Sequence, residues 1–453
     1  PVQVHGDVEN SDEVAEVTYP QINLMVQIHS MQLKAGLIRI LTLGSAVALL
    51  TGVAHSAVQA EAASPLSDQA SVALTPAFKP EDYNPAVLHI QFTSLPTGRT
   101  TPSGGDAFLD MTLIPSSGTL EGVRVELTTK DFRNQLRNLY IQLSRQDSLN
   151  VDDPNSPSRQ LHALLFESLT PILQREKVTT LLIAADRGLQ AVPFAALSDG
   201  QRYFGDRYAF SITPSLALTD LSTSGDPGQR RLALGASEFQ GLAALPLVPQ
   251  ELDRIGTEAN KDLFLNQEFT PDRFLKKAGE SVYNQLHVAT HAEFKPGGPK
   301  ASQLHSGVGP ISMDEMVKLR SERQGVPLDL VVFSACRTAL GDANAELGFS
   351  GLALQAGARS AVGTLWYVDD VVTSAYFVQM YRYLDQGVPK AEALQLTRQA
   401  FLRNLVRLDG DRVMGVNDQP LLLNLTPSQQ RRISSGANNP FFWGGIELMG
   451  SPW

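Results

Sequence analysis

Two short apolar runs, each followed by a reactive side chain, are the segments of this 453-residue sequence that could carry chemistry. The run at 285–290 is followed by His291, and the run at 328–334 ends two residues before Cys336. If both runs are neighbouring parallel strands, their carboxyl ends meet at one sheet edge, where catalytic groups gather. There an imidazole can take the thiol proton, the thiolate can attack a carbonyl, and the imidazolium can protonate the leaving amine. The pattern therefore predicts acyl transfer, with His291 as base and Cys336 as nucleophile.

Each of these side chains also has a plainer interpretation. Cys336 is the single cysteine of the chain, so one chain can form neither a disulfide nor a four-cysteine metal site. A free cysteine is often a buried, small apolar side chain, and the residue count leaves that alternative open. His287 falls inside its apolar run, which favours a buried structural histidine. His291, at the end of the run, is the better candidate for a base.

Other motifs are weak or absent. We find no G-x-x-x-x-G-K-[ST], no H-E-x-x-H and no G-x-S-x-G, and we predict neither a metal site nor a cofactor. The acidic residues Asp409, Asp411 and Asp418 lack the spacing of a calcium loop and are predicted to be solvated. Asp369 and Asp370 fit the start of a helix, where carboxylates match the positive end of the dipole. A charged pocket wall is the alternative for this pair.

The elements that must position these residues alternate between strand and helix. Apolar or alternating runs predict strands at 87–92, 107–114, 121–128, 179–185, 231–235, 285–290, 328–334 and 359–365. Helical spacing predicts helices at 131–145, 159–175, 249–260, 271–279, 313–320, 348–357, 370–385 and 389–404. Near-continuous apolar strands separated by helices indicate a mainly parallel sheet with both faces covered. We therefore predict an α/β fold, an α/β/α sandwich with a small mixed β/α region before it.

The composition limits the classes of ligand that this protein is expected to bind. The 37 Lys and Arg residues against 47 Asp and Glu residues give a net charge of −10, which argues against nucleic acid as the main ligand. Hydrophobic residues make up 43% of the chain, which excludes a disordered protein. Protein or peptide substrates, and further protein partners, fit this balance better.

The N-terminal part reads as a targeting signal. Lys34 and Arg39 form a basic start, 40–53 is an apolar or small-residue run, and Ala60 to Ala62 offers an A-x-A cleavage site. The run is shorter than the roughly 20 apolar residues that span a membrane. An uncleaved anchor or a buried helix is the alternative interpretation.

This signal predicts an exported protein, periplasmic or extracellular, with no stable membrane insertion after cleavage. Translation is predicted to start at Met31 or Met25. The predicted organisation is an upstream extension or disordered segment at 1–30, a signal peptide at 31–62, a linker at 63–86, an N-terminal β/α subdomain at 87–158 and the main α/β domain at 159–453.

Several blocks of this sequence, in order, resemble a known family. They are LLIAADRGLQAVPFAAL (181–197), HVATHAEF (287–294), the stretch 328–370 around FSACRTALG and LWYVDD, and NPFFWGGIELMG (439–450). Together they resemble the CHAT family, caspase-like domains in the cysteine-peptidase group that includes caspases, gingipains and separase. The resemblance runs from about residue 159 to the C-terminus.

The resemblance implies a caspase-like sandwich, with His291 as general base and Cys336 as nucleophile. In this group a Gly usually follows the catalytic His, and its N–H helps to bind the oxyanion. Here Ala292 stands in that place, so the backbone N–H groups of Ala292 and Cys336 are the expected oxyanion donors. Ala292 would be strained only if the position needs a positive φ.

The resemblance also bears on specificity. In separase-like relatives an acidic residue after a Leu-Trp block faces the substrate residue before the cut and favours Arg. The matching positions here are Trp366, Asp369 and Asp370, which are therefore candidate substrate-binding residues. A guanidinium held by two carboxylate oxygens is a strong pairing in a desolvated slot.

Three functions stay open at this stage. The first is a secreted, caspase-like cysteine endopeptidase that transfers the acyl group to water. The second is a catalytically idle module with the same fold that binds or scaffolds other proteins, since a fold does not fix a function. The third is transfer of the acyl group to another acceptor by the same Cys–His dyad.

Overall fold

The computed structural model describes residues 83–186, 188–221, 230–293, 302–335, 348–366 and 369–453, which lie in one compact unit, Ala77–Trp453. Among these residues an 11-stranded sheet has the order β3-β2-β1-β4-β5-β17-β13-β12-β8-β6-β7. Its strands are β1 (Pro85–Ser94), β2 (Ala107–Pro115), β3 (Glu121–Leu127), β4 (Thr180–Ala185), β5 (Ala209–Thr213), β6 (Arg231–Gly235), β7 (Lys261–Leu265), β8 (Gln285–Ala289), β12 (Leu330–Ser334), β13 (Ser360–Thr364) and β17 (Ile446–Gly450).

The sheet is mainly parallel, as predicted from the apolar runs. Strands β1, β4, β5 and β17 are parallel neighbours, and so are β13, β12, β8, β6 and β7. The two blocks meet antiparallel where β13 pairs with β17, and β2 and β3 add an antiparallel edge. Because β8, β12 and β13 are parallel to one another, their carboxyl ends share one edge of the sheet.

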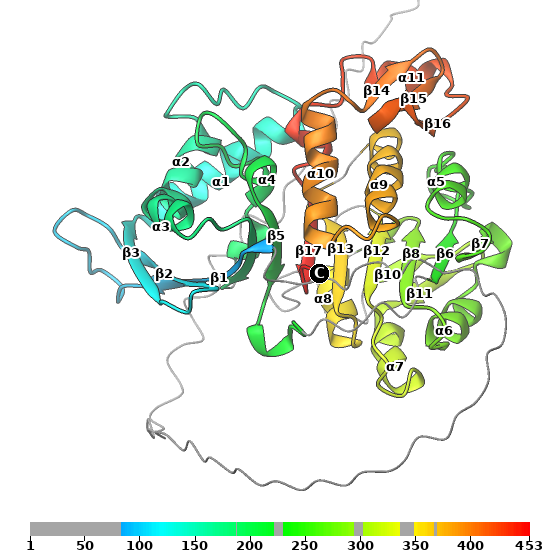
Figure 1. The fold of residues 1–453 in the computed structure, drawn as a ribbon, viewed down its shortest axis with the longest axis horizontal. Helices are drawn as coiled ribbons and strands as arrows, with labels where there is room; N and C mark the ends of the chain where they lie inside the picture. Colours follow the sequence, from blue (N-terminus) through cyan, green and yellow to red (C-terminus); the bar gives the residue numbers. More distant parts are fainter. Residues whose placement is uncertain (1–82, 187, 222–229, 294–301, 336–347, 367–368) are drawn as a thin grey trace, which may run out of the picture. The chain divides into compact units, whose positions relative to one another are not determined.

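Helices cover both faces of the sheet, so the predicted α/β/α sandwich is confirmed (Figure 1). In the view of Figure 1, α1–α5, α9 and α10 lie on one side and α6–α8 on the other. Their bounds are α1 (Thr129–Ser144), α2 (Pro157–Phe166), α3 (Thr170–Arg175), α4 (Phe204–Arg207), α5 (Val248–Arg254), α6 (Pro271–Gly279), α7 (Met313–Glu322), α8 (Gly348–Gln355), α9 (Asp370–Leu384), α10 (Lys390–Leu402) and α11 (Pro427–Ile433).

Local sequence explains where several elements begin. Thr128 caps α1 by accepting a hydrogen bond from the Asp131 N–H, and Thr270 caps α6 through the Arg273 N–H. The β4 residues TLLIAA are buried throughout, as expected for a strand covered on both faces. A core of Leu, Val, Phe and Met side chains then packs α6, α7 and α8 against β6, β8 and β12.

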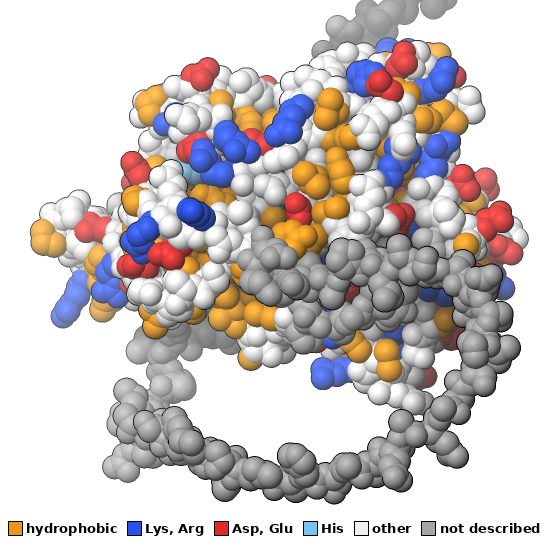
Figure 2. Space-filling view, in the orientation of Figure 1, with side chains coloured by type: hydrophobic (Ala, Val, Ile, Leu, Met, Phe, Trp, Pro, Cys, Tyr) orange, Lys and Arg blue, Asp and Glu red, His pale blue; other side chains and the backbone are white. Residues whose placement is uncertain are grey.

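Two short sheets complete the described structure. The strands β9 (Ala292–Glu293), β10 (Gln303–His305) and β11 (Pro310–Ser312) form one, and β14 (Arg407–Asp409), β15 (Arg412–Met414) and β16 (Pro420–Leu422) form the other. The first begins directly after His291. On the face shown in Figure 2, basic and acidic side chains are interspersed, with apolar side chains between them.

Several of the predicted elements needed correction. The helix expected at 249–260 ends at Arg254, and strand β7 follows it. β7 lies at the sheet edge with half-exposed residues, so it lacks a buried apolar run. β5 and β17 were also not predicted, because polar residues interrupt their apolar runs, Ser211 in β5 and Glu447 in β17. The strands of the N-terminal region join the same sheet through β1 and β4, while its boundary at 158 stays a prediction.

Candidate active site

The carboxyl ends of β8 and β12 lie side by side. Ala289 pairs with Ser334 in register, and the N–H of Thr290 donates to the Ser334 carbonyl over 3.3 Å. His291 follows Ala289 by two residues, as Cys336 follows Ser334. Cys336 itself lies outside the described residues. The two strands that lead to His291 and Cys336 are therefore parallel neighbours, as predicted from the sequence.

His291 has a defined orientation. Its Nε2 lies 2.8 Å from the carbonyl oxygen of Ala243, an acceptor, so Nε2 carries the hydrogen and donates it. The ring packs on Phe239, with centroids 4.7 Å apart. The imidazole therefore presents Nδ1 as its remaining acceptor, and a carbonyl oxygen is placed to stabilise the imidazolium that forms when Nδ1 takes a proton.

The loop that orients His291 is held at several points. It spans residues 236–247 between β6 and α5. The Ala236 N–H donates to the Ala289 carbonyl over 3.0 Å, and the Leu245 N–H donates to the Ser237 carbonyl over 2.9 Å. Sequence analysis missed Ala243 because it acts through its backbone carbonyl, which carries no side-chain signal.

Ala292 fits its position without backbone strain. It lies in strand β9 and is not among the residues with positive φ. The His305 N–H donates to the His291 carbonyl over 2.9 Å, so Ala292 and Leu304 form the pair that does not exchange hydrogen bonds. The N–H of Ala292 therefore points away from β10. Its oxyanion role, like that of the Cys336 N–H, stays a prediction.

His287 is the buried structural histidine that the sequence predicts. It is 0% exposed on β8, with Nε2 2.9 Å from Oε1 of Glu251 on α5. On its other side, Nδ1 lies 3.3 Å from the hydroxyl of Tyr381 on α9. Both ring nitrogens of His287 are thus engaged, so of these two histidines His291 is the one that can serve as base.

Asp369 and Asp370 already hold a guanidinium of the same chain. Asp369 caps α9, and its Oδ1 accepts from the N–H groups of Val371 and Val372 over 2.9 and 3.2 Å. Its Oδ2 accepts from Nε of Arg432 over 2.6 Å, and Asp370 pairs with the same guanidinium. Burial raises the pKa of Asp369, with Arg432 opposing the rise. The helix-start interpretation is confirmed, and substrate binding stays a prediction that requires Arg432 to be displaced.

Trp366 serves to pack this end of the sheet. Its Nε1–H donates to the Phe441 carbonyl over 2.9 Å, and its ring meets Tyr140 edge-on at 5.7 Å. A Cβ on Gly445 would lie 2.6 Å from the indole, so this position needs glycine. Contact of Trp366 with substrate stays a prediction.

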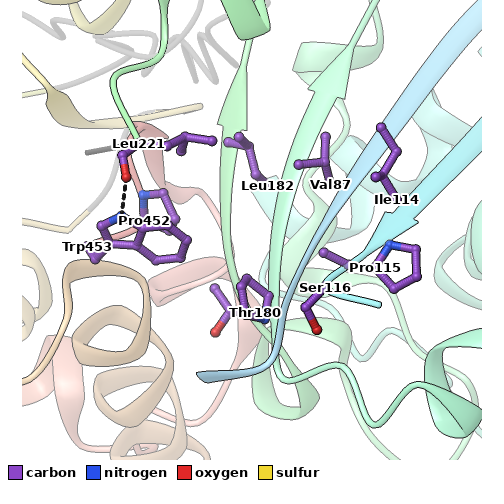
Figure 3. Close-up of a pocket in the computed structure, with 11 residues that line it drawn as sticks. Val87, Ile114, Pro115, Ser116, Thr180, Leu182, Leu221, Pro452 and Trp453 are labelled. Atoms are coloured by element: carbon purple, nitrogen blue, oxygen red, sulfur yellow. Dashed lines mark hydrogen bonds between the residues drawn. The ribbon is translucent and has the colours of Figure 1, made fainter. Parts of the chain in front are cut away.

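A separate, mainly apolar pocket of about 190 Å³ is lined by the starts of β1 and β4, the end of β2 and the last two residues of the chain (Figure 3). In Figure 3 the side chains of Leu221, Leu182, Val87 and Ile114 follow one another in a row beside Trp453. None of the predicted site residues lines this pocket, and its mainly apolar walls offer no acid or base.

The described residues contain no group of three or more His, Cys, Asp and Glu side chains that could hold a metal ion. Asp411 and Asp418 are exposed and form ion pairs with Arg412 and Arg407. Among the helices of the described ranges, none combines the length and the apolar character that a membrane span requires.

An α/β/α sandwich with this order and direction of strands is a caspase-like fold. The CHAT domain model matches residues 155–451, more than half of the sequence. The chain belongs to the CHAT domain family. A comparison with curated protein sequences finds no match.

Solved structures of similar fold are cysteine peptidases. Separase of Saccharomyces cerevisiae, in its complex with securin, matches with a TM-score of 0.46 at 10% identity, covering 82% of this chain and 30% of its own. Gingipain R, an Arg-specific cysteine proteinase of Porphyromonas gingivalis, matches with a TM-score of 0.39 at 9% identity, covering 71% of this chain and 75% of its own. The chain thus spans less than a third of the separase chain.

Proposed function

We propose that this protein is a caspase-like cysteine endopeptidase, in which Cys336 is the nucleophile and His291 the general base. The observation that carries the proposal is the oriented imidazole of His291, with Nε2–H bound to the Ala243 carbonyl, beside the strand that runs into Cys336. Its Nδ1 takes the thiol proton, the thiolate attacks the peptide carbonyl carbon, and Nδ1 then protonates the leaving amine. Water hydrolyses the acyl-enzyme and regenerates the thiol.

Two further features support this proposal. The N–H of Ala292, directed away from β10, is available as an oxyanion donor, and each such donor is worth roughly 3 kcal/mol in the transition state. An imidazolium beside a thiol lowers the thiol pKa from about 8.5 to roughly 3.5–7.5, which supplies a thiolate at neutral pH. Proteins or peptides are the substrate class, and no cofactor takes part.

A peptidyl electrophile that alkylates thiols tests the proposal directly. Because the chain has a single cysteine, any label must lie on Cys336. We expect rapid labelling at neutral pH in the wild type and slow labelling in His291→Ala, as followed by intact-protein mass spectrometry. Equal labelling of the two proteins favours the alternative, a catalytically idle scaffold in which the thiol is ordinary.

We also propose export through the signal segment at 31–62. Expression of the whole sequence in a secreting bacterial host should yield a mature protein that starts near Ala63, since the basic start, apolar run and A-x-A site are what signal peptidase reads. N-terminal sequencing of the periplasmic fraction checks this. A cytoplasmic protein that still begins at Pro1 or Met31 would contradict it.

A further inference from the structure

We propose that Glu251, acting through His287, is a positioning residue that keeps the imidazole of His291 in register with the carbonyl of Ala243. The inference rests on the peptidase function proposed above and assigns to that site a buried brace that touches neither substrate nor thiol.

The brace is a closed network of four buried side chains from three elements. Glu251 lies on α5, His287 on β8, and Ser374 and Tyr381 on α9. None of them is more than 2% exposed. The Glu251 carboxylate accepts from His287 Nε2–H over 2.9 Å and from the Ser374 hydroxyl over 2.6 Å. Both of its oxygens are therefore engaged.

A neutral imidazole at His287 that donates from Nε2 fits the contacts of this network. Since His287 donates from Nε2, its Nδ1 is an acceptor for the Tyr381 hydroxyl at 3.3 Å. Burial raises the pKa of Tyr381, so its hydroxyl keeps the hydrogen that this bond needs. The ring of Phe377 meets the imidazole edge-on at 5.7 Å and closes the network from the apolar side.

Two short stretches of chain connect this network to the site, one to His291 and one to Ala243. His287 stands four residues before His291, on the strand β8 that ends two residues before the base. Glu251 stands eight residues after Ala243, on the helix that follows the orienting loop. The contact between Glu251 and His287 thus joins the strand that carries the base to the helix that anchors the carbonyl. This contact, the His291–Ala243 hydrogen bond and the two stretches of chain together form a closed loop.

Stability alone is a poor reason for such a network. Burying ionisable groups costs desolvation, and apolar replacements of similar volume are often neutral or stabilising. A hydrogen-bonded pair, however, fixes distance and direction far more narrowly than apolar packing does. A shift of about 1 Å in a catalytic group can lower a rate by roughly 10²-fold, so this precision is useful where the base meets its orienting carbonyl.

The test is the pH profile of alkylation of Cys336 by iodoacetamide, which reports on the imidazole beside the thiol without a substrate. In Glu251→Ala we expect the rate at mildly acid pH to fall about tenfold, because a misplaced His291 stabilises less thiolate. Glu251→Gln keeps a carbonyl oxygen for His287 and an amide for Ser374. We expect it to stay within about twofold of the wild type.

A matched control separates positioning from general destabilisation. Lys390→Met removes a different polar contact, that of the buried Lys390 with Asp329 at 2.7 Å, in which neither residue belongs to the orienting loop. Thermal midpoints and far-ultraviolet circular dichroism are recorded for every variant. If Glu251→Ala does not fold, Glu251→Asp, whose shorter side chain draws the carboxylate away from His287, is compared with Glu251→Gln in the same assay.

The outcomes distinguish the two proposals. A wild-type profile of an ordinary thiol, unchanged by His291→Ala, overturns the peptidase function. A wild-type profile that depends on His291, combined with Glu251→Ala and Glu251→Asp profiles no different from that of Lys390→Met, overturns the positioning role alone. A loss in Glu251→Ala or Glu251→Asp that Glu251→Gln restores supports it.

Discussion

Replacing Cys336 with alanine is expected to abolish peptide hydrolysis, and His291→Ala to lower kcat/KM by at least roughly 10²–10⁴-fold. The first variant has no nucleophile, because the chain contains no second thiol. His291→Ala loses Nδ1, the ring nitrogen that the hydrogen bond to Ala243 does not use and that we propose as the proton acceptor. The measurement is turnover of a fluorogenic peptide library by the purified mature protein.

A histidine control is available on the same sheet. His89 lies exposed on β1, at the far end of the strand order from β8, and His89→Ala should retain full activity. Equal turnover by the wild type and by Cys336→Ala would refute the endopeptidase proposal. The scaffold alternative would then remain.

Glu447→Gln is expected to stabilise the protein, and to do so more as the pH rises. Glu447 lies in β17 opposite Gly363 and is 0% exposed. Within the described ranges neither carboxyl oxygen has a hydrogen-bond partner. Burial raises the pKa of Glu447 well above its usual value, and the buried Arg398 only partly opposes this rise. The native state therefore keeps a proton that the unfolded chain releases near pH 4.5.

The sign of the pH dependence follows from this difference in protons. Between the unfolded and the native pKa of Glu447, the native state binds more protons, so the free energy of unfolding falls as the pH rises. The slope from one such group is at most about 1.4 kcal/mol per pH unit. Below the unfolded pKa the contribution is complete, and it is lost as the pH rises through the native pKa. Glutamine has no proton to lose, so Glu447→Gln removes the slope.

Chemical denaturation at a series of pH values from 5 to 8 measures this effect. The gap between Glu447→Gln and the wild type should widen steadily with pH. Glu258→Gln, which changes an exposed carboxylate, serves as the control and should follow the wild type within about 0.5 kcal/mol. Parallel curves for Glu447→Gln and the wild type would show that Glu447 is ionised in the folded protein.

Much of the fold could be predicted because its strands are short apolar runs. The runs at 179–185 and 285–290 correspond to β4 and β8, and both strands are buried along their whole length. Helix starts at Thr128 and Thr270 follow from hydroxyl caps that the neighbouring residues define locally. A residue whose structural role depends on its neighbours in the chain can be predicted from the sequence pattern.

Several features depend on contacts distant in the sequence. β17, close to the C-terminus, inserts between β5 and β13, and the reversal of strand direction there is visible only in the folded sheet. Arg432 reaches Asp369 across 63 residues, and no spacing rule connects them. The acidic pair could therefore be predicted as a helix start, but not as one already bound to a guanidinium.

The sequence by itself determined the alternation of strand and helix, the family, and the two residues proposed as base and nucleophile, because these depend on local periodicity and on residue type. Only the tertiary structure decided how the base is held. The Ala243 carbonyl and the Phe239 ring come from a loop 48 or more residues before His291, and Glu251 comes from a helix 36 residues before His287. Every residue has a backbone carbonyl, so the sequence does not show which carbonyl binds the imidazole of His291. The folded chain brings the Ala243 carbonyl to that position.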